Sequence, residues 1–227
     1  MIDVPVLIVG GGPVGLTASI LLSQHGVRSL LAERHPGTAI LPKARGINAR
    51  TMEMYRQCGV DQEIRDAGLP VERTGLIVWT EDPGGEEIER RVPGRATAQN
   101  MAVTPVRNCL CAQDYLEPVL RRFAERLEPG QLRFNAEVTA VEQDAASRDR
   151  HPHRPSERRR DPVRAQYVIA ADGTQSAIRR MLGVTMIGPE AVYDSVNILF
   201  NADLRRGRRT GRPRSTSSSS RTCGPRS

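Results

Sequence analysis

The sequence lacks a long hydrophobic run. None of its 227 residues lies in an apolar stretch of 18, so a membrane-spanning helix is excluded. The apolar start, residues 1–9, has no basic flank and runs directly into glycines, so it predicts a strand and not a secretory signal. We therefore expect a cytoplasmic protein without a membrane partner, and one long enough to bury a sizeable core.

Cysteine and histidine are scarce, with four residues of each. The spacing of Cys109 and Cys111 fits neither a zinc knuckle nor a C-x-x-C redox pair, so reduced thiols are expected. His151 and His153 have no acidic or cysteine residues at ligand spacing, so no metal site is predicted. No Ser/His/Asp constellation can be read from the chain either, and no catalytic side chain is assigned.

Lysine is almost absent, because Lys43 stands alone against 32 arginines. The net charge of +7 is uneven: residues 148–164 carry +4, residues 204–227 carry +8, and the rest of the chain is mildly acidic at −5. A nucleic-acid-binding protein would spread its basic face over a folded domain. We expect no nucleic acid partner, but an irregular basic insert at 145–165 and a disordered basic tail at 204–227.

What the chain does have is a glycine-rich motif between two apolar runs. Gly10, Gly12 and Gly15 form G-x-G-x-x-G directly after the run of residues 4–9. Glu33 ends the next run, 23 positions after the first glycine. This order of strand, turn, helix, strand and acid is typical of a dinucleotide-binding fold, in which the acid follows by about 20 residues.

Each residue type suits such a site. Gly10 permits a tight turn, Gly12 lets the backbone approach a diphosphate, and Gly15 lets the helix pack closely on the strand. The helix N-terminus offers N–H groups and the positive end of its dipole to an anion. Glu33 can accept hydrogen bonds from ribose hydroxyls, and its charge argues against the 2′-phosphate of NADP. The alternative is a glycine-rich turn that binds nothing.

Periodicity and turn signals predict an α/β chain. Asp61 is predicted as the N-cap of a short helix, and a turn at 82–85 joins two strands that interrupt the α/β pattern and suggest a second domain. Residues 167–171 are expected to form a buried strand. Helices are expected at 13–25, 48–58, 61–67, 113–127 and 176–182. Further strands are expected at 4–9, 27–33, 74–80, 86–92, 132–134 and 137–143.

Four segments together resemble the flavoprotein aromatic hydroxylases, the single-component FAD-dependent monooxygenases that include para-hydroxybenzoate hydroxylase. They are the glycine-rich start, residues 44–59 (ARGINARTMEMYRQCG), residues 113–120 (QDYLEPVL) and the "DG" segment 170–183 (AADGTQSAIRRMLG). The likeness is to the polyketide and anthracycline hydroxylases and covers most of residues 1–147 and 165–203. It implies a Rossmann-like FAD-binding fold of the glutathione reductase type, with an incomplete β-rich substrate domain.

The resemblance implies FAD as cofactor, NADPH as transient reductant, and a small aromatic or polyketide substrate. In that family the flavin carries the chemistry, while the protein orients the substrate and excludes water. Arg45 would lie near the flavin and the diphosphate, where a planar guanidinium suits phosphate oxygens. Gln113 would contact the ribityl–flavin side, and Asp172 with Gly173 would close the site beside the nucleotide. The expected cofactor-binding residues are Gly10, Gly12, Pro13, Val14, Gly15, Glu33, Arg34, Arg45, Gln113, Asp172 and Gly173.

Plainer roles stay open for three of these residues. Arg45 could be a solvated loop residue, Gln113 an ordinary residue at the start of a helix, and Asp172 the cap of the helix that follows. Two other functions stay open as well. One is another flavoprotein oxidoreductase of the same fold, although a halogenase would carry tryptophan-rich motifs and Trp79 is the only tryptophan. The other is a non-catalytic binding protein with a basic tail.

The sequence departs from the family in its second half. The "GD" motif, whose aspartate binds the ribityl chain in that family, is absent, as is most of the substrate domain. We expect a truncated form that is inactive alone, and the arginine-rich composition suggests that 145–165 and 204–227 are out-of-frame readings of a GC-rich gene. A natural flexible tail is the alternative. The expected domains are an FAD-binding domain at 1–71 and 100–182, and a substrate-domain fragment at 72–99 and 183–203.

Overall fold

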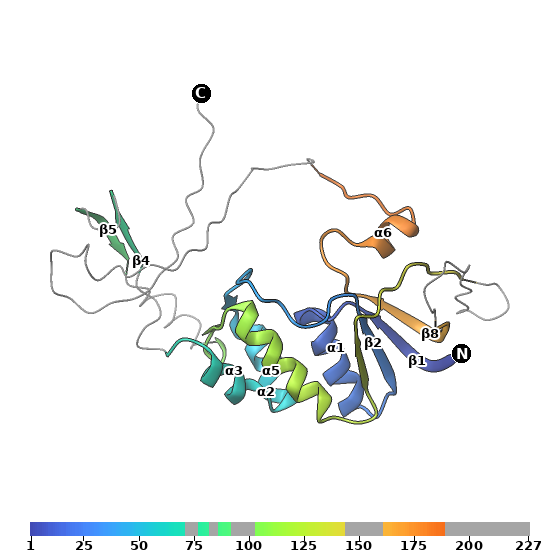
Figure 1. The fold of residues 1–227 in the computed structure, drawn as a ribbon. Coiled ribbons are helices and arrows are strands. Elements are labelled where there is room, and N and C mark those ends of the chain that lie inside the picture. The colour runs from blue at the N-terminus through green and yellow to red at the C-terminus, as the bar shows by residue number, and fades with distance from the viewer. Residues whose placement is uncertain (71–76, 82–85, 92–102, 144–160, 189–227) are drawn as a thin grey trace.

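The computed structural model describes residues 1–70, 77–81, 86–91, 103–143 and 161–188 (Figure 1). The helices are α1 (Pro13–Gln24), α2 (Ala49–Cys58), α3 (Asp61–Ala67), α5 (Gln113–Glu125) and α6 (Ala177–Met181). The strands are β1 (Ile2–Val9), β2 (Ser29–Glu33), β3 (Gly46–Ile47), β4 (Ile77–Thr80), β5 (Glu87–Arg91), β6 (Cys109–Leu110), β7 (Gln131–Phe134) and β8 (Val163–Ala170).

Four strands form a parallel sheet in the order β7-β2-β1-β8. The chain passes from β1 through α1 to β2 on one side, and much later returns to pair β8 with the other side of β1. Val6 of β1 therefore lies between Ser29 and Tyr167. Because all four strands are parallel, their carboxyl ends share one edge, and the change of direction beside β1 is where ligands bind in open α/β sheets. The Rossmann-like α/β prediction is confirmed.

Both faces of the two central strands, β1 and β2, are covered, which explains why these two strands are almost continuous apolar runs. Helices α1, α2, α3 and α5 gather on one face (Figure 1). Ile8 and Leu31 of the sheet pack there against Leu16 and Ile20 of α1 and Leu120 of α5. The opposite face carries a smaller core that includes side chains of β1 and β2. Its buried members are Val4, Leu7, Val9, Leu30, Ala32, Ala165 and Ile178 of α6.

The ends of α2 follow their sequence signals, but the start of α3 does not. Asn48 caps α2 by accepting a hydrogen bond of 2.8 Å from the Thr51 N–H, and Gly59 ends the helix with a φ of +83°. The prediction of Asp61 as an N-cap is wrong, because Val60 is the N-cap and Asp61 is the first helical residue. The negative charge of Asp61 therefore stabilises α3 by lying at the positive end of the helix dipole, and its side chain makes no capping hydrogen bond.

Three strand predictions need correction. Residues 137–143 form no strand; Val138 and Val141 instead pack against the smaller core. The strand expected at 167–171 begins earlier, at Val163, so residues 163–165 belong to the sheet and not to an irregular insert. It is also not fully buried: Tyr167 is 69% exposed, because β8 is an edge among the described strands.

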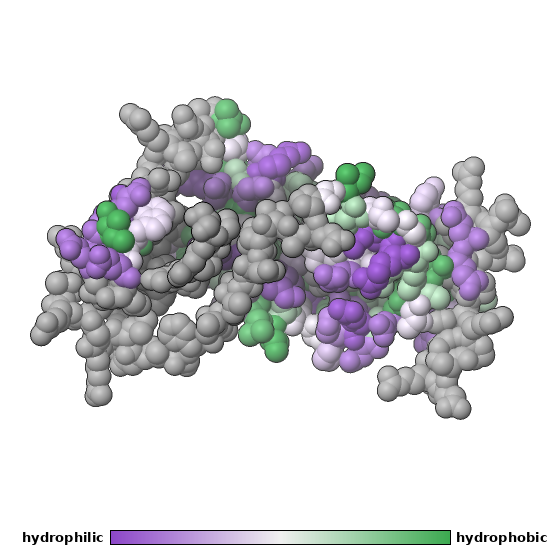
Figure 2. Space-filling model, turned by 90° about the horizontal axis from the view of Figure 1, so that it is seen from above, coloured by the Kyte–Doolittle hydropathy of each residue, from purple (hydrophilic) through white to green (hydrophobic). Residues whose placement is uncertain are grey.

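Two small antiparallel sheets complete the described chain. Strands β4 and β5 pair with each other and stand apart from the parallel sheet (Figure 1), and the turn predicted at 82–85 lies outside the described residues. Strand β3 pairs with β6. The helix expected to reach residue 127 ends at Glu125. Hydrophobic residues show at the surface as separate patches among hydrophilic ones (Figure 2). Within the described ranges, none of the helices combines the length and apolar character that crossing a bilayer requires.

Candidate functional site

The glycine-rich turn joins β1 to α1 at the carboxyl edge of the sheet. Gly10 has a φ of +109°, and a Cβ there would lie 2.4 Å from the carbonyl oxygen of Ala171. A Cβ on Gly15 would lie only 1.9 Å from the carbonyl oxygen of Gly10. Both positions therefore require glycine, the first for the turn and the second for the close approach of α1. These two predicted roles agree with the geometry.

The first turn of α1 is open at Gly12 and exposed at Val14. Gly12 is the N-cap, makes no side-chain capping bond, and is followed by Pro13 at the first helical position. A Cβ on Gly12 would meet no atom nearer than Glu117 Oε1, at 3.9 Å, and Val14 is 67% exposed. Backbone N–H groups at an uncapped helix start, in a cradle that a side chain would fill, suit the diphosphate of a dinucleotide.

Glu33, at the end of β2, closes onto this turn. Its Oε2 accepts a hydrogen bond of 2.6 Å from the Gly11 N–H. Its Oε1 accepts one of 2.8 Å from the His35 N–H and lies 2.5 Å from His35 Nδ1. Each carboxylate oxygen has two acceptor sites, so Oε1 is filled and Oε2 retains one. Glu33 can therefore accept one ribose hydroxyl without giving up its present partners.

These contacts hold the carboxylate in its charged form. Burial alone would raise the pKa of Glu33, but the N–H groups of Gly11 and His35, together with the His35 ring, outweigh it and set that pKa below 4.5. Sequence reasoning passed over Gly11, the middle glycine of the turn. A Cβ on Gly11 would lie 2.8 Å from the Cβ of Glu33, so glycine is what admits the acid.

Asp172 lies on the other side of the turn, just after β8. A Cβ on Gly10 would come within 3.1 Å of the Asp172 Cα, so the "DG" segment borders the glycine-rich turn. The Asp172 carboxylate accepts hydrogen bonds from Ser176 Oγ at 2.6 Å and from the Ile178 N–H at 3.1 Å. Burial would raise the pKa of Asp172, but these bonds lower it overall. Ser176 is the N-cap of α6, and its Oγ accepts a hydrogen bond of 2.9 Å from the Arg179 N–H, so Asp172 supports this cap but is not the N-cap residue.

Asp172→Ala is expected to lower the free energy of unfolding by about 1–2 kcal/mol, because the start of α6 loses two charge-assisted bonds. Urea denaturation followed by circular dichroism measures this change. Gln175→Ala, at an exposed position of the same turn, serves as the control and should stay within about 0.5 kcal/mol of the parent chain. An unchanged midpoint for Asp172→Ala would show that the carboxylate does not hold the helix.

Gln113 lies next to the segment that carries Arg45, because β3 pairs with β6 and Gln113 bonds to Ala44, contacts that the sequence did not reveal. Strand β3 begins directly after Arg45 and pairs with β6, shortly before α5. The Gln113 N–H donates to the carbonyl oxygen of Ala44 at 2.8 Å, and the Ala44 N–H donates to Gln113 Oε1 at 3.4 Å.

Three other predicted site residues lie at the surface or beside open space. Arg45 is exposed, as is Arg34, which follows Glu33 directly. Gly173, with a φ of +83°, has open space where a Cβ would stand.

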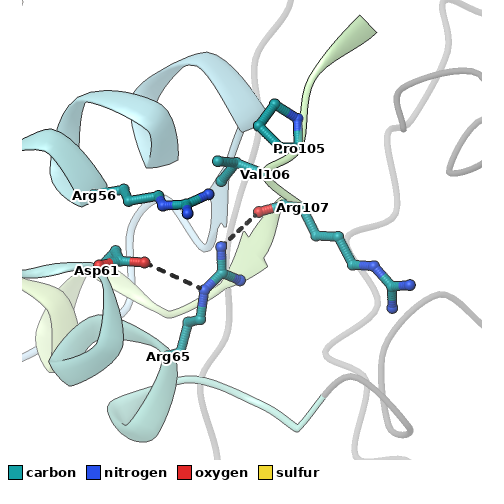
Figure 3. A pocket seen from close by; sticks show the side chains of 6 residues that line it. All are labelled: Arg56, Asp61, Arg65, Pro105, Val106 and Arg107. Atoms are coloured by element: carbon teal, nitrogen blue, oxygen red, sulfur yellow. Dashed lines mark hydrogen bonds and ion pairs between the residues drawn. The ribbon is translucent and has the colours of Figure 1, made fainter. Parts of the chain in front are cut away.

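A pocket of about 260 Å³ lies elsewhere, beside α2, α3 and residues 105–107 (Figure 3). Arg65 lies between Asp61 and the Arg107 carbonyl oxygen, to which it donates a hydrogen bond of 3.0 Å. The Arg107 guanidinium points away from this group (Figure 3). None of the lining residues belongs to the glycine-rich turn, so this pocket is separate from the candidate site.

The cysteines in the described chain are free and buried, as expected for reduced thiols: Cys58, Cys109 and Cys111. Burial, with smaller contributions from Cys109 and Asp114, raises the pKa of Cys111 to about 11. Such thiols are protonated and unreactive at neutral pH. Cys223, His151, His153 and both predicted basic segments, apart from residues 161–165, lie outside the described residues.

Comparison with known proteins identifies a family and several relatives. Residues 3–221 match the protein family described as "FAD binding domain". The tetracenomycin B2 monooxygenase-dioxygenase of Streptomyces olivaceus is 38% identical over 217 residues, covering 89% of this chain and 40% of that protein. The chain spans well under half the length of the curated relatives it matches.

Two solved structures have the same arrangement of elements. The flavin-dependent monooxygenase PieE, in complex with FAD and substrate, has a TM-score of 0.70 and 33% identity, covering 86% of this chain and 33% of that one. The ternary complex of aklavinone-11 hydroxylase with FAD and aklavinone has a TM-score of 0.68 and 32% identity, covering 81% and 35%. At these identities the likeness extends beyond the fold to the sequence.

Proposed function

This chain belongs to the FAD-binding domain family of the flavin-dependent monooxygenases, and from that premise we propose that its glycine-rich turn holds the diphosphate of FAD while Glu33 holds the adenosine ribose. The hydrogen bond of 2.6 Å from the Gly11 N–H to Glu33 Oε2 carries the proposal. This bond holds the Glu33 carboxylate, the proposed ligand of the ribose hydroxyls, next to the glycine-rich turn, the proposed ligand of the diphosphate. A dinucleotide requires these two sites to be adjacent.

The other predicted residues have supporting roles in this proposal. Arg45 offers a planar cation to phosphate oxygens, and Gln113 offers an amide to the ribityl–flavin side. Asp172 holds the start of α6 while its backbone borders Gly10. Pro13 and Val14 shape the first turn of α1, and Arg34 extends the edge beyond Glu33.

The reaction in which this site takes part is proposed to be hydroxylation of an aromatic or polyketide substrate, with NADPH as the reductant. FAD, when bound, supplies the redox and oxygen-transfer chemistry. The described residues of this chain bind and orient the nucleotide, and none of them is assigned as an acid or base. The complexes of the similar proteins with FAD and with aklavinone support this substrate class.

The proposal is tested by titrating the purified chain with FAD and then competing with nucleotide fragments. ADP is expected to displace FAD, because the site recognises the adenosine ribose and the diphosphate. FMN, which lacks the adenosine, should compete at least about tenfold less well than ADP. NADP should bind more weakly than NAD, since its 2′-phosphate would meet the charge of Glu33. Absence of FAD binding, or equal competition by FMN and ADP, would refute the proposal.

A further inference from the structure

Glu117 is a buried carboxylate of α5 that lies inside the family-like segment 113–120 but was given no role by the sequence. Only 3% of the residue is exposed. Its Oε2 accepts a hydrogen bond of 2.5 Å from the Ala39 N–H, and its Oε1 accepts one of 2.6 Å from Gln113 Nε2. Burying a charge is costly unless donors satisfy it, so these two bonds define what the residue does in the fold.

The two bonds reach both ends of one segment, residues 39–45, which follows β2 and carries Arg45. Glu117 holds the first end directly, at the N–H of Ala39. The second end is held by Gln113, whose backbone N–H donates to the Ala44 oxygen at 2.8 Å, and Glu117 acts on this end only through its bond to the Gln113 side chain. The side-chain oxygen of Gln113 also accepts from the Ala44 N–H, at 3.4 Å. Segment 39–45 is thereby tied to α5 at two points.

The same carboxylate fixes which way the Gln113 amide faces. A carboxylate accepts hydrogen bonds but does not donate them, so the Gln113 NH₂ group must face Glu117. The Gln113 oxygen is then turned to the other side, toward Ala44. Glu117 Oε1 also lies beside the turn, 3.9 Å from where a Cβ of Gly12 would stand.

We infer that Glu117 is a positioning residue of the nucleotide site, which anchors segment 39–45 to α5 and presents Gln113 with its oxygen as the acceptor. The inference rests on the proposed function, because Arg45 and Gln113 are the residues that Glu117 places for FAD. Glu117 itself need not touch the cofactor. Its effect is measurable without FAD, in the stability of the segment that it holds.

The chain offers a specific probe of this segment. Lys43 is its single lysine and is exposed, so a lysine-specific protease can cut the native chain at one bond only. Cleavage requires the segment to open locally, so its rate reports the anchor. Glu117→Ala is expected to raise that rate about tenfold. The control is Glu125→Ala, an exposed residue of α5 that pairs with Arg121, and it should leave the rate unchanged. Equal rates for Glu117→Ala and the parent chain would overturn the inference.

The orientation of the Gln113 amide is tested by exchanging the two side chains. Glu117→Gln keeps the shape of the side chain. Its single oxygen can accept from the Ala39 N–H only if its NH₂ group faces the NH₂ group of Gln113, and two donors then meet. Cleavage should again be about tenfold faster, and FAD should bind about tenfold more weakly. In the double variant Gln113→Glu/Glu117→Gln, the amide at position 117 donates to the carboxylate at position 113. The N–H groups of Ala39 and Ala44 each keep an acceptor oxygen. Its cleavage rate should return to within about threefold of the parent rate.

Three further outcomes separate the two proposals. If the double variant is cut as fast as Glu117→Gln, the assigned amide orientation is wrong. If Glu117→Gln opens the segment but binds FAD like the parent chain, Glu117 is an anchor without a role in the site and the inference fails. If the parent chain binds no FAD, the proposed function fails, while the protease rates still decide whether Glu117 anchors the segment.

Discussion

A chain carrying Gly15→Ala is expected to lose about 3 kcal/mol of stability and to bind FAD about 100-fold more weakly. The new Cβ would lie 1.9 Å from the carbonyl oxygen of Gly10 and 3.0 Å from its carbonyl carbon. Both atoms belong to the backbone, so no side chain can turn aside and α1 itself must move away from β1. That movement carries the N–H groups at the helix start away from the proposed diphosphate site.

Urea denaturation and FAD titration measure the two effects separately. Gly37→Ala is the matched control, because a Cβ there would meet no atom within 4 Å and its φ lies outside the left-handed region. It should change the free energy of unfolding by no more than about 0.5 kcal/mol. A Gly15→Ala chain with the parent midpoint and the parent affinity would contradict the close packing of α1 on the turn.

Glu33→Ala is expected to cost about 2–3 kcal/mol of stability and to weaken FAD binding by about 10- to 50-fold. It removes the acceptor for the N–H groups of Gly11 and His35, and it removes the proposed ligand of the ribose. Glu33→Gln keeps one acceptor oxygen and should lose about 1 kcal/mol. Glu63→Gln, at a partly exposed residue paired with Arg126, is the control and should stay within about 0.5 kcal/mol of the parent chain.

The stabilisation by Glu33 should also depend on pH in a defined direction. Its pKa is lowered by folding, so the folded chain favours the charged carboxylate more than the unfolded chain does. The contribution is therefore complete above the unfolded value, 4.5, and is lost as the pH falls through the lower folded value. The difference in unfolding free energy between the parent chain and Glu33→Gln should shrink as the pH falls from about 5 to about 3. A difference that grows on acidification would contradict the assignment.

The part of the site that the sequence predicted correctly is the part encoded within one short stretch. From β1 to Glu33, each step depends on neighbours in the chain: an apolar strand, glycines where no Cβ fits, a helix, and a second apolar strand. Asn48 and Gly59 likewise mark the ends of α2 by local chemistry. Family resemblance predicts that Asp172 lies beside the nucleotide, and the structure brings its backbone against the glycine-rich turn, a contact that no local signal in the sequence reveals.

The features that were missed depend on tertiary contacts. Helix α3 starts at Asp61 directly after the end of α2. In a sequence, an acidic residue at the first helical position cannot be told apart from an acidic N-cap residue. Residues 137–143 have a strand-like composition but find no partner strand in the described structure, and their valines pack onto the sheet instead. Glu117 could have been noticed as an acid four positions after Gln113, next to the buried Leu116. The use of that acid depends on Ala39, which no periodicity connects to α5.

The pairing of β8 with β1 has a consequence for how the protein is made. Ile2 pairs with Val163, a separation of about 160 residues, so this ladder closes one of the longest loops that the chain allows. Such high contact order slows folding, and on the ribosome β1 emerges long before its partner exists. Until β8 arrives, one edge of β1 is unpaired and Gly10 has no Ala171 beside it. An unpaired strand edge of this kind can pair with other chains, and the glycine-rich turn gains its last neighbour only when β8 has been made.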